Sequence, residues 1–387
     1  MIQNGVLYLG VLLFLTAIVA YAEKKWKDSK LFKYIPGIVL IYIFGAVLQT
    51  AGVFADSASN DAVYTGVKDL LLPAMLILML LHCDLRKIIK MGPKILLTFF
   101  FASLTIIVGF VITYSLLKGF YAEDTWKAFA ALSGSWTGGS ANMVALQDIL
   151  DVPENIFGYA LIMDTINYSI WVMFMFWLVP HAARFNRWTD AKGVDVPSEI
   201  EVAVADEKEK GKIGFNEMMV LVGGSIFLSA VCWEIGGNLP AIGAVFNTTT
   251  WAVIIASIIG LVLAVTPVAK IPGSSEISRV MLYVIIALIA SHADFSQIFQ
   301  APIYILSGFM ILLIHALAML LVAKLFKLDL FTMGVASLAN VGGMASAPVL
   351  AGAYHQSLVP VGVLMALLGN LLGTYYGILT AYLLSGL

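Results

Sequence analysis

Two short glycine-rich stretches interrupt this otherwise apolar chain and carry polar groups that could bind a solute. They read SGSWTGGSAN at 133–142 and ASLANVGGMASAP at 336–348. Glycine lets the backbone turn tightly and lets a ligand approach the free N–H and C=O groups. A simpler alternative stays open, in which the small residues only allow close packing of helices. We predict the following substrate-binding residues: Thr137, Gly138, Gly139, Ser140, Asn142, Asn340, Gly342, Gly343, Ser346 and Asn370.

An ionisable side chain lies within the apolar segment that follows the first stretch. Asp164 occurs well inside residues 155–180, and Asn167 follows three positions later on the same helical face. A carboxylate at such a depth is costly, so by default it indicates a functional site. We predict that Asp164 and Asn167 couple transport to a cation, either by holding Na⁺ together or by Asp164 carrying a proton. A structural carboxylate bonded to nearby backbone is the alternative.

The elements that position these residues must be membrane-spanning helices. The chain of 387 residues is 60% hydrophobic and only 12% charged, with a mean hydropathy of +0.94, which excludes a soluble protein. Apolar stretches of about twenty residues recur, each long enough to cross a hydrocarbon core of ~30 Å. We expect twelve apolar segments, at 4–22, 34–54, 66–85, 94–118, 126–150, 155–180, 215–233, 250–268, 278–297, 302–326, 331–353 and 358–385.

One long polar stretch, 181–214, divides the chain into halves. Its charges alternate in sign and it lacks apolar periodicity, so we interpret it as a cytoplasmic linker that is partly disordered. The halves, 1–180 and 215–387, look like two copies of one repeat. Three features recur in the same order at nearly constant spacing, namely the pair His82 and Asp84 with His292 and Asp294, the two glycine pairs, and Asn167 with Asn370.

Loop charges predict how the chain is threaded. Lysine and arginine mark cytoplasmic loops, which places 23–33, 86–94 and 181–214 inside and the N-terminus outside. Segment 126–150 then starts and ends on the same side. A helix over its first half rises ~16 Å, about half the hydrocarbon thickness, so a re-entrant hairpin fits. A broken helix that crosses fully is the alternative.

The predicted fold is therefore an all-α polytopic membrane protein. It consists of two inverted repeats, each with five crossings plus a re-entrant or broken-helix element, because an odd number of crossings turns the second copy upside down. The hairpin at 331–353 then enters from the inside. Inverted repeats with interrupted helices at matching positions are typical of secondary transporters, whose substrate sites lie near the bilayer midplane.

These features predict a secondary transporter of a small organic solute, coupled to Na⁺ or H⁺. An anion is the expected solute, because the N-termini of half-helices favour negative charge. A Na⁺/H⁺ antiporter is the second hypothesis, and a channel or a membrane-embedded enzyme is the third. No HExxH, GxSxG, P-loop or nucleic-acid motif occurs. We therefore expect no enzyme activity, no cofactor, no nucleic-acid partner, and no metal site other than Na⁺ at Asp164.

The stretches GSWTGGSANMVALQDIL, MDTINYSIW and LANVGGMASAPVLAGAY resemble the YjcL-type integral membrane proteins, a family defined by a domain of unknown function. The likeness covers nearly the whole chain. That family looks like a relative of the sodium/glutamate symporters, the 2-hydroxycarboxylate transporters and the bile-acid and cation/proton antiporter superfamily. The resemblance implies a homodimer in the cell membrane (inner or plasma), with a scaffold domain and a transport domain that moves by an elevator-type alternating-access mechanism.

The resemblance also bears on single residues. In the antiporters a carboxylate follows the first interrupted helix, and Asp164 stands at the matching place. The next residue is Thr165, where several antiporters carry a second polar or acidic group, so proton stoichiometry is not carried over. The charged residue of a dicarboxylate carrier is not evident in VGGMASAP, so substrate identity is not carried over either.

Overall fold

The computed structural model describes residues 1–387 except 28, 30, 31, 33, 34, 36, 192–212, 242–246, 293–300, 356 and 357. The described part is built of helices, with one isolated bridge between Ile2 and Phe54. The α-helices are α1 (Gly5–Lys25), α3 (Gly37–Thr50), α4 (Ala58–Leu80), α5 (Leu85–Ile89), α6 (Pro93–Leu117), α7 (Thr125–Gly138), α8 (Ser140–Ile149), α9 (Glu154–Leu178), α10 (Ala182–Thr189), α12 (Phe215–Gly237), α13 (Thr248–Ala264), α14 (Ser274–Ala290), α15 (Ala301–Phe326), α16 (Leu330–Val341), α17 (Gly343–Tyr354) and α18 (Val359–Ser385).

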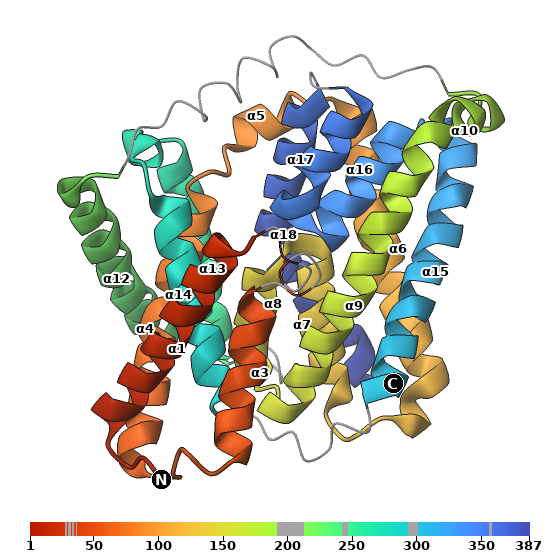
Figure 1. The fold of residues 1–387 in the computed structure, drawn as a ribbon. Coiled ribbons are helices and arrows are strands. Elements are labelled where there is room, and N and C mark those ends of the chain that lie inside the picture. Colours follow the sequence, from red (N-terminus) through yellow and green to blue (C-terminus); the bar gives the residue numbers. More distant parts are fainter. Residues whose placement is uncertain are drawn as a thin grey trace.

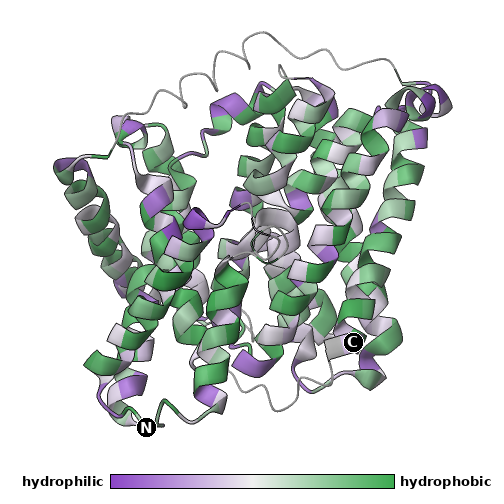
Figure 2. Ribbon diagram, in the orientation of Figure 1, coloured by the Kyte–Doolittle hydropathy of each residue, from purple (hydrophilic) through white to green (hydrophobic). Residues whose placement is uncertain are grey.

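Seven helical stretches of the described chain are long and apolar enough to cross a membrane. Figure 2 shows that hydrophobic residues predominate along these helices. This confirms the prediction of an all-α polytopic membrane protein. Three expected crossings are shorter helices, α3, α13 and α14, and their depth in a bilayer stays a prediction. The seven stretches are Gly5–Lys25, Ala58–Leu80, Pro93–Phe120, Glu154–Thr189, Phe215–Gly237, Pro302–Phe326 and Val359–Ser385.

The helices pack into two groups (Figure 1). Contacts are dense within each group and sparse between them. Each group takes helices from both sides of residues 192–212, so neither half of the chain folds as a separate body. The relation of the halves by an inverted repeat stays a prediction. Group one contains α1, α3, α4, α12, α13 and α14, and group two contains α6, α7, α8, α9, α15, α16, α17 and α18.

Both glycine-rich stretches form antiparallel helical hairpins within group two. In the first, Lys127 Nζ near the start of α7 lies 3.4 Å from the carbonyl oxygen of Asp151, which follows α8. In the second, the ring of Phe331 near the start of α16 lies 5.5 Å from that of Tyr354 at the end of α17. A straight broken helix would hold each pair tens of ångströms apart, at 1.5 Å per residue.

The two hairpins approach each other from opposite ends of the bundle. Thr125, where α7 begins, has its hydroxyl 3.0 Å from Tyr304 Oη near the start of α15. The α16–α17 hairpin begins at Leu330, just after α15 ends. Since α15 has 26 residues and spans ~39 Å, the open ends of the hairpins are far apart and their tips meet in between (Figure 1). How deep these tips lie in a bilayer stays a prediction.

The predicted linker is more ordered at its start than expected. Residues 182–189 form α10, a short helix after α9 that places Phe185 against the bundle and Arg184 and Arg187 on its exposed side. Residues 192–212 lie outside the described part of the chain. We call the end of the bundle that carries α10 and Ile213, the residue after this stretch, the linker end (Figure 1).

The paired His-x-Asp features occupy different environments. His82 Nε2 lies 2.8 Å from Ser274 Oγ and 2.9 Å from Ser275 Oγ. Asp84 caps α5 and pairs with Arg86. The ring of His292 lies 4.2 Å from that of Tyr64, tilted by 41°, and Asp294 lies outside the described residues.

Candidate functional site

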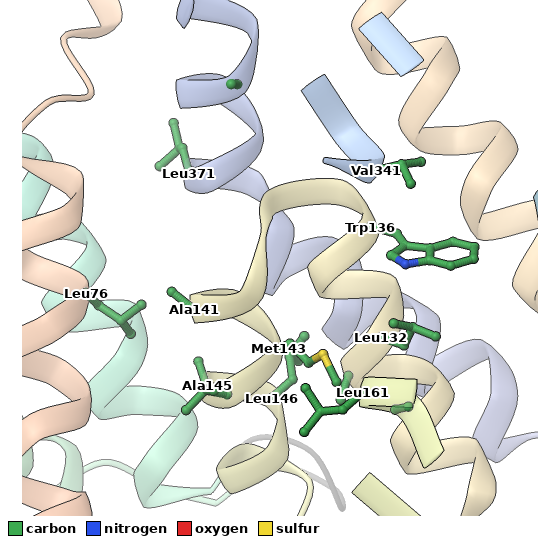
Figure 3. Packing of buried hydrophobic residues seen from close by; sticks show 14 of the residues in the cluster. Leu76, Leu132, Trp136, Ala141, Met143, Ala145, Leu146, Leu161, Val341 and Leu371 are labelled. Atoms are coloured by element: carbon green, nitrogen blue, oxygen red, sulfur yellow. The ribbon is translucent and has the colours of Figure 1, made fainter. Parts of the chain in front are cut away.

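The tip of the first hairpin turns at Gly139. Its φ of +96° is a conformation that residues with a Cβ rarely adopt, so glycine is required there. Figure 3 shows the tip from close by, with Trp136 on one side and Ala141 on the other. The hairpin therefore presents two faces, and each faces a different part of the site.

The second tip turns at Gly342 and Gly343. Gly343 has a φ of +55°, and a Cβ on Gly342 would lie 2.0 Å from Ser346 Oγ and 2.5 Å from a ring carbon of Tyr168. The sequence-based expectation of two glycine tips thus corresponds to two chain reversals. Both reversals occur within the stretches 133–142 and 336–348.

Other glycines serve helix packing, as the alternative explanation proposed. A Cβ on Gly138 would lie 2.4 Å from the carbonyl oxygen of Gly369 and 2.7 Å from the Cα of Gly373. Gly134 also lies against the backbone of Gly373. Small residues at four-residue spacing on α7 and α18 let the two backbones touch. Close packing and tip formation therefore both occur, at different glycines.

A cavity of about 600 Å³ opens at the two tips, between group one and group two. It continues past Met75 and Met79 of α4 to His82 and Gly273 at the linker end. Ile213, next to the undescribed stretch, packs on Gly273 and marks that end. Six of the predicted site residues line the cavity, namely Gly138, Gly139, Ser140, Gly342, Gly343 and Asn370.

Group one supplies polar lining residues that the sequence-based prediction missed. They lie at the start of α14 and include Ser275, Glu276, Ser278 and Arg279. Positions 275, 278, 279 and 282 all line the cavity, which is the spacing of one helical face. The sequence did contain a signal for these lining residues, namely a run of polar residues at the start of an apolar segment, together with His82 just after α4.

The N-termini of two helices lie at the tip end of the cavity, next to the C-termini of α7 and α16. Helix α8 starts at Ser140 and α17 starts at Gly343, and neither N-terminus has a side-chain cap. A helix N-terminus behaves as about half a positive charge because its first N–H groups lack partners. Arg279 adds a full positive charge from α14, and Glu276, one turn nearer the linker end, adds one negative charge. The arrangement suits a small solute with at least one anionic group.

Four predicted site residues are not among the residues that line the cavity, and their polar groups bond to the protein. Asn142 Nδ2 donates to the carbonyls of Gly138 (2.8 Å) and Asn370 (3.2 Å), while its Oδ1 accepts from Thr374 (2.6 Å). The remaining three direct their polar groups to nearby helices or to their own backbone. Thr137 Oγ1 donates to Ser133 O, Asn340 Nδ2 donates to Ala336 O and its Oδ1 accepts from Ser103 Oγ, and Ser346 Oγ donates to Leu338 O.

Asp164 lies behind the tips, on the face of the first hairpin that carries Trp136. Trp136 Nε1 donates to Asp164 Oδ1 at 2.8 Å, and Ser135 Oγ donates to Oδ2 at 3.4 Å. Within the described residues no lysine, arginine or histidine pairs with this carboxylate. One turn further along α9, Tyr168 is hydrogen-bonded to Ser346 of the second hairpin. The carboxylate thus lies on a helix that contacts both hairpins.

Asn167 points to a different partner than Asp164. Its Nδ2 donates to the carbonyl oxygen of Ile305 on α15 at 3.1 Å, and its fully buried side chain packs on Gly308. Its Oδ1 is buried without a hydrogen-bond partner in the described part of the chain. Asp164 and Asn167, which the sequence placed on one helical face, therefore contact different helices: Asp164 contacts α7 and Asn167 contacts α15.

In the described part of the chain, no group of three or more His, Cys, Asp or Glu side chains is arranged to hold a metal ion. The site combines a cavity that two helix N-termini face with a separate carboxylate that has no cationic partner among the described residues. Such a pair of adjacent sites can bind a solute on one face of a hairpin and a cation on the other.

Comparison with known proteins places the chain in a family. It is 25% identical over 376 residues to the uncharacterized membrane protein YjcL of Bacillus subtilis (strain 168), an alignment that covers 91% of this chain and 90% of that protein. A family model described as a protein of unknown function, DUF819, matches residues 10–387. Because the match spans nearly every helix described above, the chain belongs to the DUF819 family of membrane proteins.

Proposed function

We propose that this protein is a cation-coupled secondary transporter of a small organic anion. The observation that carries the proposal is the cavity of about 600 Å³ at two opposed hairpin tips, which two uncapped helix N-termini face. Binding sites at interrupted helices with exposed N–H groups are the common design of secondary transporters. The kinship with symporter and antiporter superfamilies inferred from the sequence supports the same function and belongs to this proposal.

The coupling cation binds at Asp164 in this proposal. A carboxylate within a membrane-spanning helix, with neutral donors from Trp136 and Ser135, has one negative charge available for Na⁺ or H⁺. Since Asp164 lies behind the tips and the solute cavity lies in front, the two ligands occupy opposite faces of one hairpin. Binding of either ligand then changes the geometry that the other one meets.

Transport in this proposal follows an elevator-type mechanism. Group two, with both hairpins, moves against group one, which acts as the scaffold and holds the homodimer. The sparse contacts between the groups support relative motion, because few interactions must break. The protein would lie in the cell membrane (inner or plasma) with its N-terminus outside and the linker end inside.

The test is flux in proteoliposomes with separately imposed Na⁺ and pH gradients. A thermal-shift screen of organic anions and amino acids, with and without Na⁺, first selects the solute, because a ligand that binds the native state raises its apparent stability. We expect solute uptake that follows one cation gradient. Uptake that ignores both gradients would exclude a coupled transporter and favour a channel.

The Na⁺/H⁺ antiporter stays the second candidate because Asp164 has no cationic partner among the described residues. It predicts Na⁺-driven proton movement without any organic solute. Asp164→Asn should abolish coupling in either case, whereas Asp61→Asn, an exposed acid in the first turn of α4, should leave it unchanged. Full coupling in the Asp164→Asn protein would remove Asp164 from the mechanism.

A further inference from the structure

A second cavity lies on the far side of group two, away from the hairpin tips. It measures about 160 Å³ and opens between α9, α10, α15 and α16. Its lining is almost wholly apolar and comes from four helices. The lining residues are Trp171, Phe174, Met175, Leu178, Phe185, His315, Ala316, Met319, Leu320, Leu330, Met333 and Ser337.

The polar groups in this second cavity already have partners. His315 is fully buried, with Nδ1 2.7 Å from Thr105 Oγ1 and Nε2 2.9 Å from Ser337 Oγ. Ser337 Oγ also accepts from Trp171 Nε1 at 3.0 Å. Among the described lining residues, a polar solute would therefore find no free side-chain donor or acceptor, and a hydrocarbon chain matches the lining.

Basic side chains cluster beside this cavity at the linker end. Phe185 of α10 lines the cavity, while Arg184 and Arg187 of the same helix are exposed and form no ion pair among the described residues. Lys324 lies one turn beyond Leu320 on α15, bonds to the carbonyl of Trp188, and is 3.7 Å from Asp190. Arg184, Arg187 and Lys324 thus outnumber Asp190, the one carboxylate of α10 and its C-cap, so the patch keeps a net positive charge.

We propose that this place is a binding site for an anionic phospholipid, with one acyl chain in the cavity and the phosphate at Arg184, Arg187 and Lys324. Two properties of α10 support this occupant. Its apolar face packs on the bundle while its basic face is exposed, as in helices that lie at a membrane surface. Basic clusters directly next to spanning helices attract anionic head groups. The site uses other residues than the transport proposal and does not depend on it.

The experiment measures lipid binding to the purified full chain in detergent after delipidation. The probes are dioleoyl phosphatidylglycerol, dioleoyl phosphatidylcholine with the same chains, and glycerol phosphate without chains. Thermal shift gives the concentration for half-maximal stabilisation, and native mass spectrometry counts the retained lipids. We expect phosphatidylglycerol to bind at least tenfold more tightly than phosphatidylcholine, and glycerol phosphate to cause no shift that depends on Arg184 and Arg187.

Two variants separate the chain from the head group. Ala316→Phe fills the cavity and should abolish retention, while Ala318→Phe, outside the lining on the same helix, should keep it. Removing both arginines in R184Q/R187Q should weaken phosphatidylglycerol binding by about thirtyfold, as expected for two basic groups near an anionic surface. The control K24Q/K27Q removes two exposed lysines elsewhere and should have no effect.

Three results would overturn the proposal. They are equal binding of the two diacyl lipids, a glycerol phosphate shift that R184Q/R187Q abolishes, and retention by a folded Ala316→Phe protein. The comparison of lipids on the unmodified chain decides the matter even if that variant fails to fold.

Discussion

An ion pair between the two helix groups should hold the cavity open toward the linker end. Lys68 Nζ of α4 lies 2.6 Å from Asp148 Oδ1 of α8, and the two side chains are only 12% and 11% exposed. Lys68 lies two turns of α4 from Met75, the nearest cavity residue of that helix, on the side away from the linker end. Tyr64 Oη donates to Glu154 at 3.2 Å and Asn247 Nδ2 to Ile149 O at 2.9 Å, so both also bridge the groups.

The magnitude follows from the burial of this pair. Removing one partner of a buried ion pair costs about 3–5 kcal/mol, because the other charge stays buried alone. With a tenth of each side chain still exposed, we take about 2–3 kcal/mol for Lys68→Met. If the pair forms only in the arrangement of the two helix groups seen here, its loss lowers the population of this arrangement relative to the moved one by about 30- to 150-fold.

The double variant K68M/D148L tests whether the ion pair keeps the cavity accessible from the linker end, and it leaves no buried charge. Replacing both partners by apolar residues is often neutral for folding. A single cysteine replaces Ser140 in the cavity, with Cys83 and Cys232 changed to serine. Its labelling by a maleimide added to either side of sealed vesicles measures from which side the cavity is accessible. We expect labelling from the linker side to fall and labelling from the other side to rise, while K68R keeps the original pattern. Unchanged labelling of the folded double variant would refute the reasoning.

Three further predictions concern packing, charge and pH. Thermal unfolding should show a strongly lowered Tm for Gly138→Ala, because the added Cβ would lie 2.4 Å from a backbone atom of α18. The control Gly66→Ala, on an open helix surface, should keep the Tm of the wild type. Arg279→Gln should raise the KM for an anionic solute several-fold and Lys270→Gln, outside the cavity, should not, which flux measurements check. The hydrogen bond from Arg86 holds the pKa of Asp84 below its ordinary value. The ionised carboxylate therefore stabilises the fold at pH values above its unfolded-state pKa of about 4. This stabilisation is lost as the pH falls through the lower pKa of the folded state. The Tm difference between wild type and Asp84→Asn should therefore vanish in acid.

Backbone features of the site could be predicted from the sequence because they depend on local chemistry. The chain reversals fall at Gly139 and Gly342, within the two stretches chosen for their glycines. The class of fold followed from hydropathy, because only helices satisfy their own backbone in a long apolar chain. The choice between a packing role and a tip role for each glycine needed the position of α18, which no local pattern contains.

Side-chain partners were harder to predict, because amides and hydroxyls have several acceptors within reach. Asn142 and Asn340 were expected to face a solute, yet both bond to a carbonyl four residues earlier. Arg279 lies far from either glycine stretch in sequence, and only the packing of α14 against the hairpins brings it to the cavity. The contact from Trp136 to Asp164 likewise depends on how α7 packs on α9.

In the proposed transporter, the placement of Asp164 gives a physical route by which the cation and the solute would affect each other. Trp136 connects the carboxylate to the first hairpin, and Tyr168, one turn away on α9, connects the same helix to Ser346 of the second. A cation at Asp164 competes with Trp136 and Ser135 for the carboxylate oxygens, so it must alter contacts directly behind the tips. A solute at the tips acts on the same backbone from the other face. Because linkage is reciprocal, the solute must then change cation affinity by the same factor. Measuring both affinities, each with and without the other ligand, tests whether α9 carries this coupling.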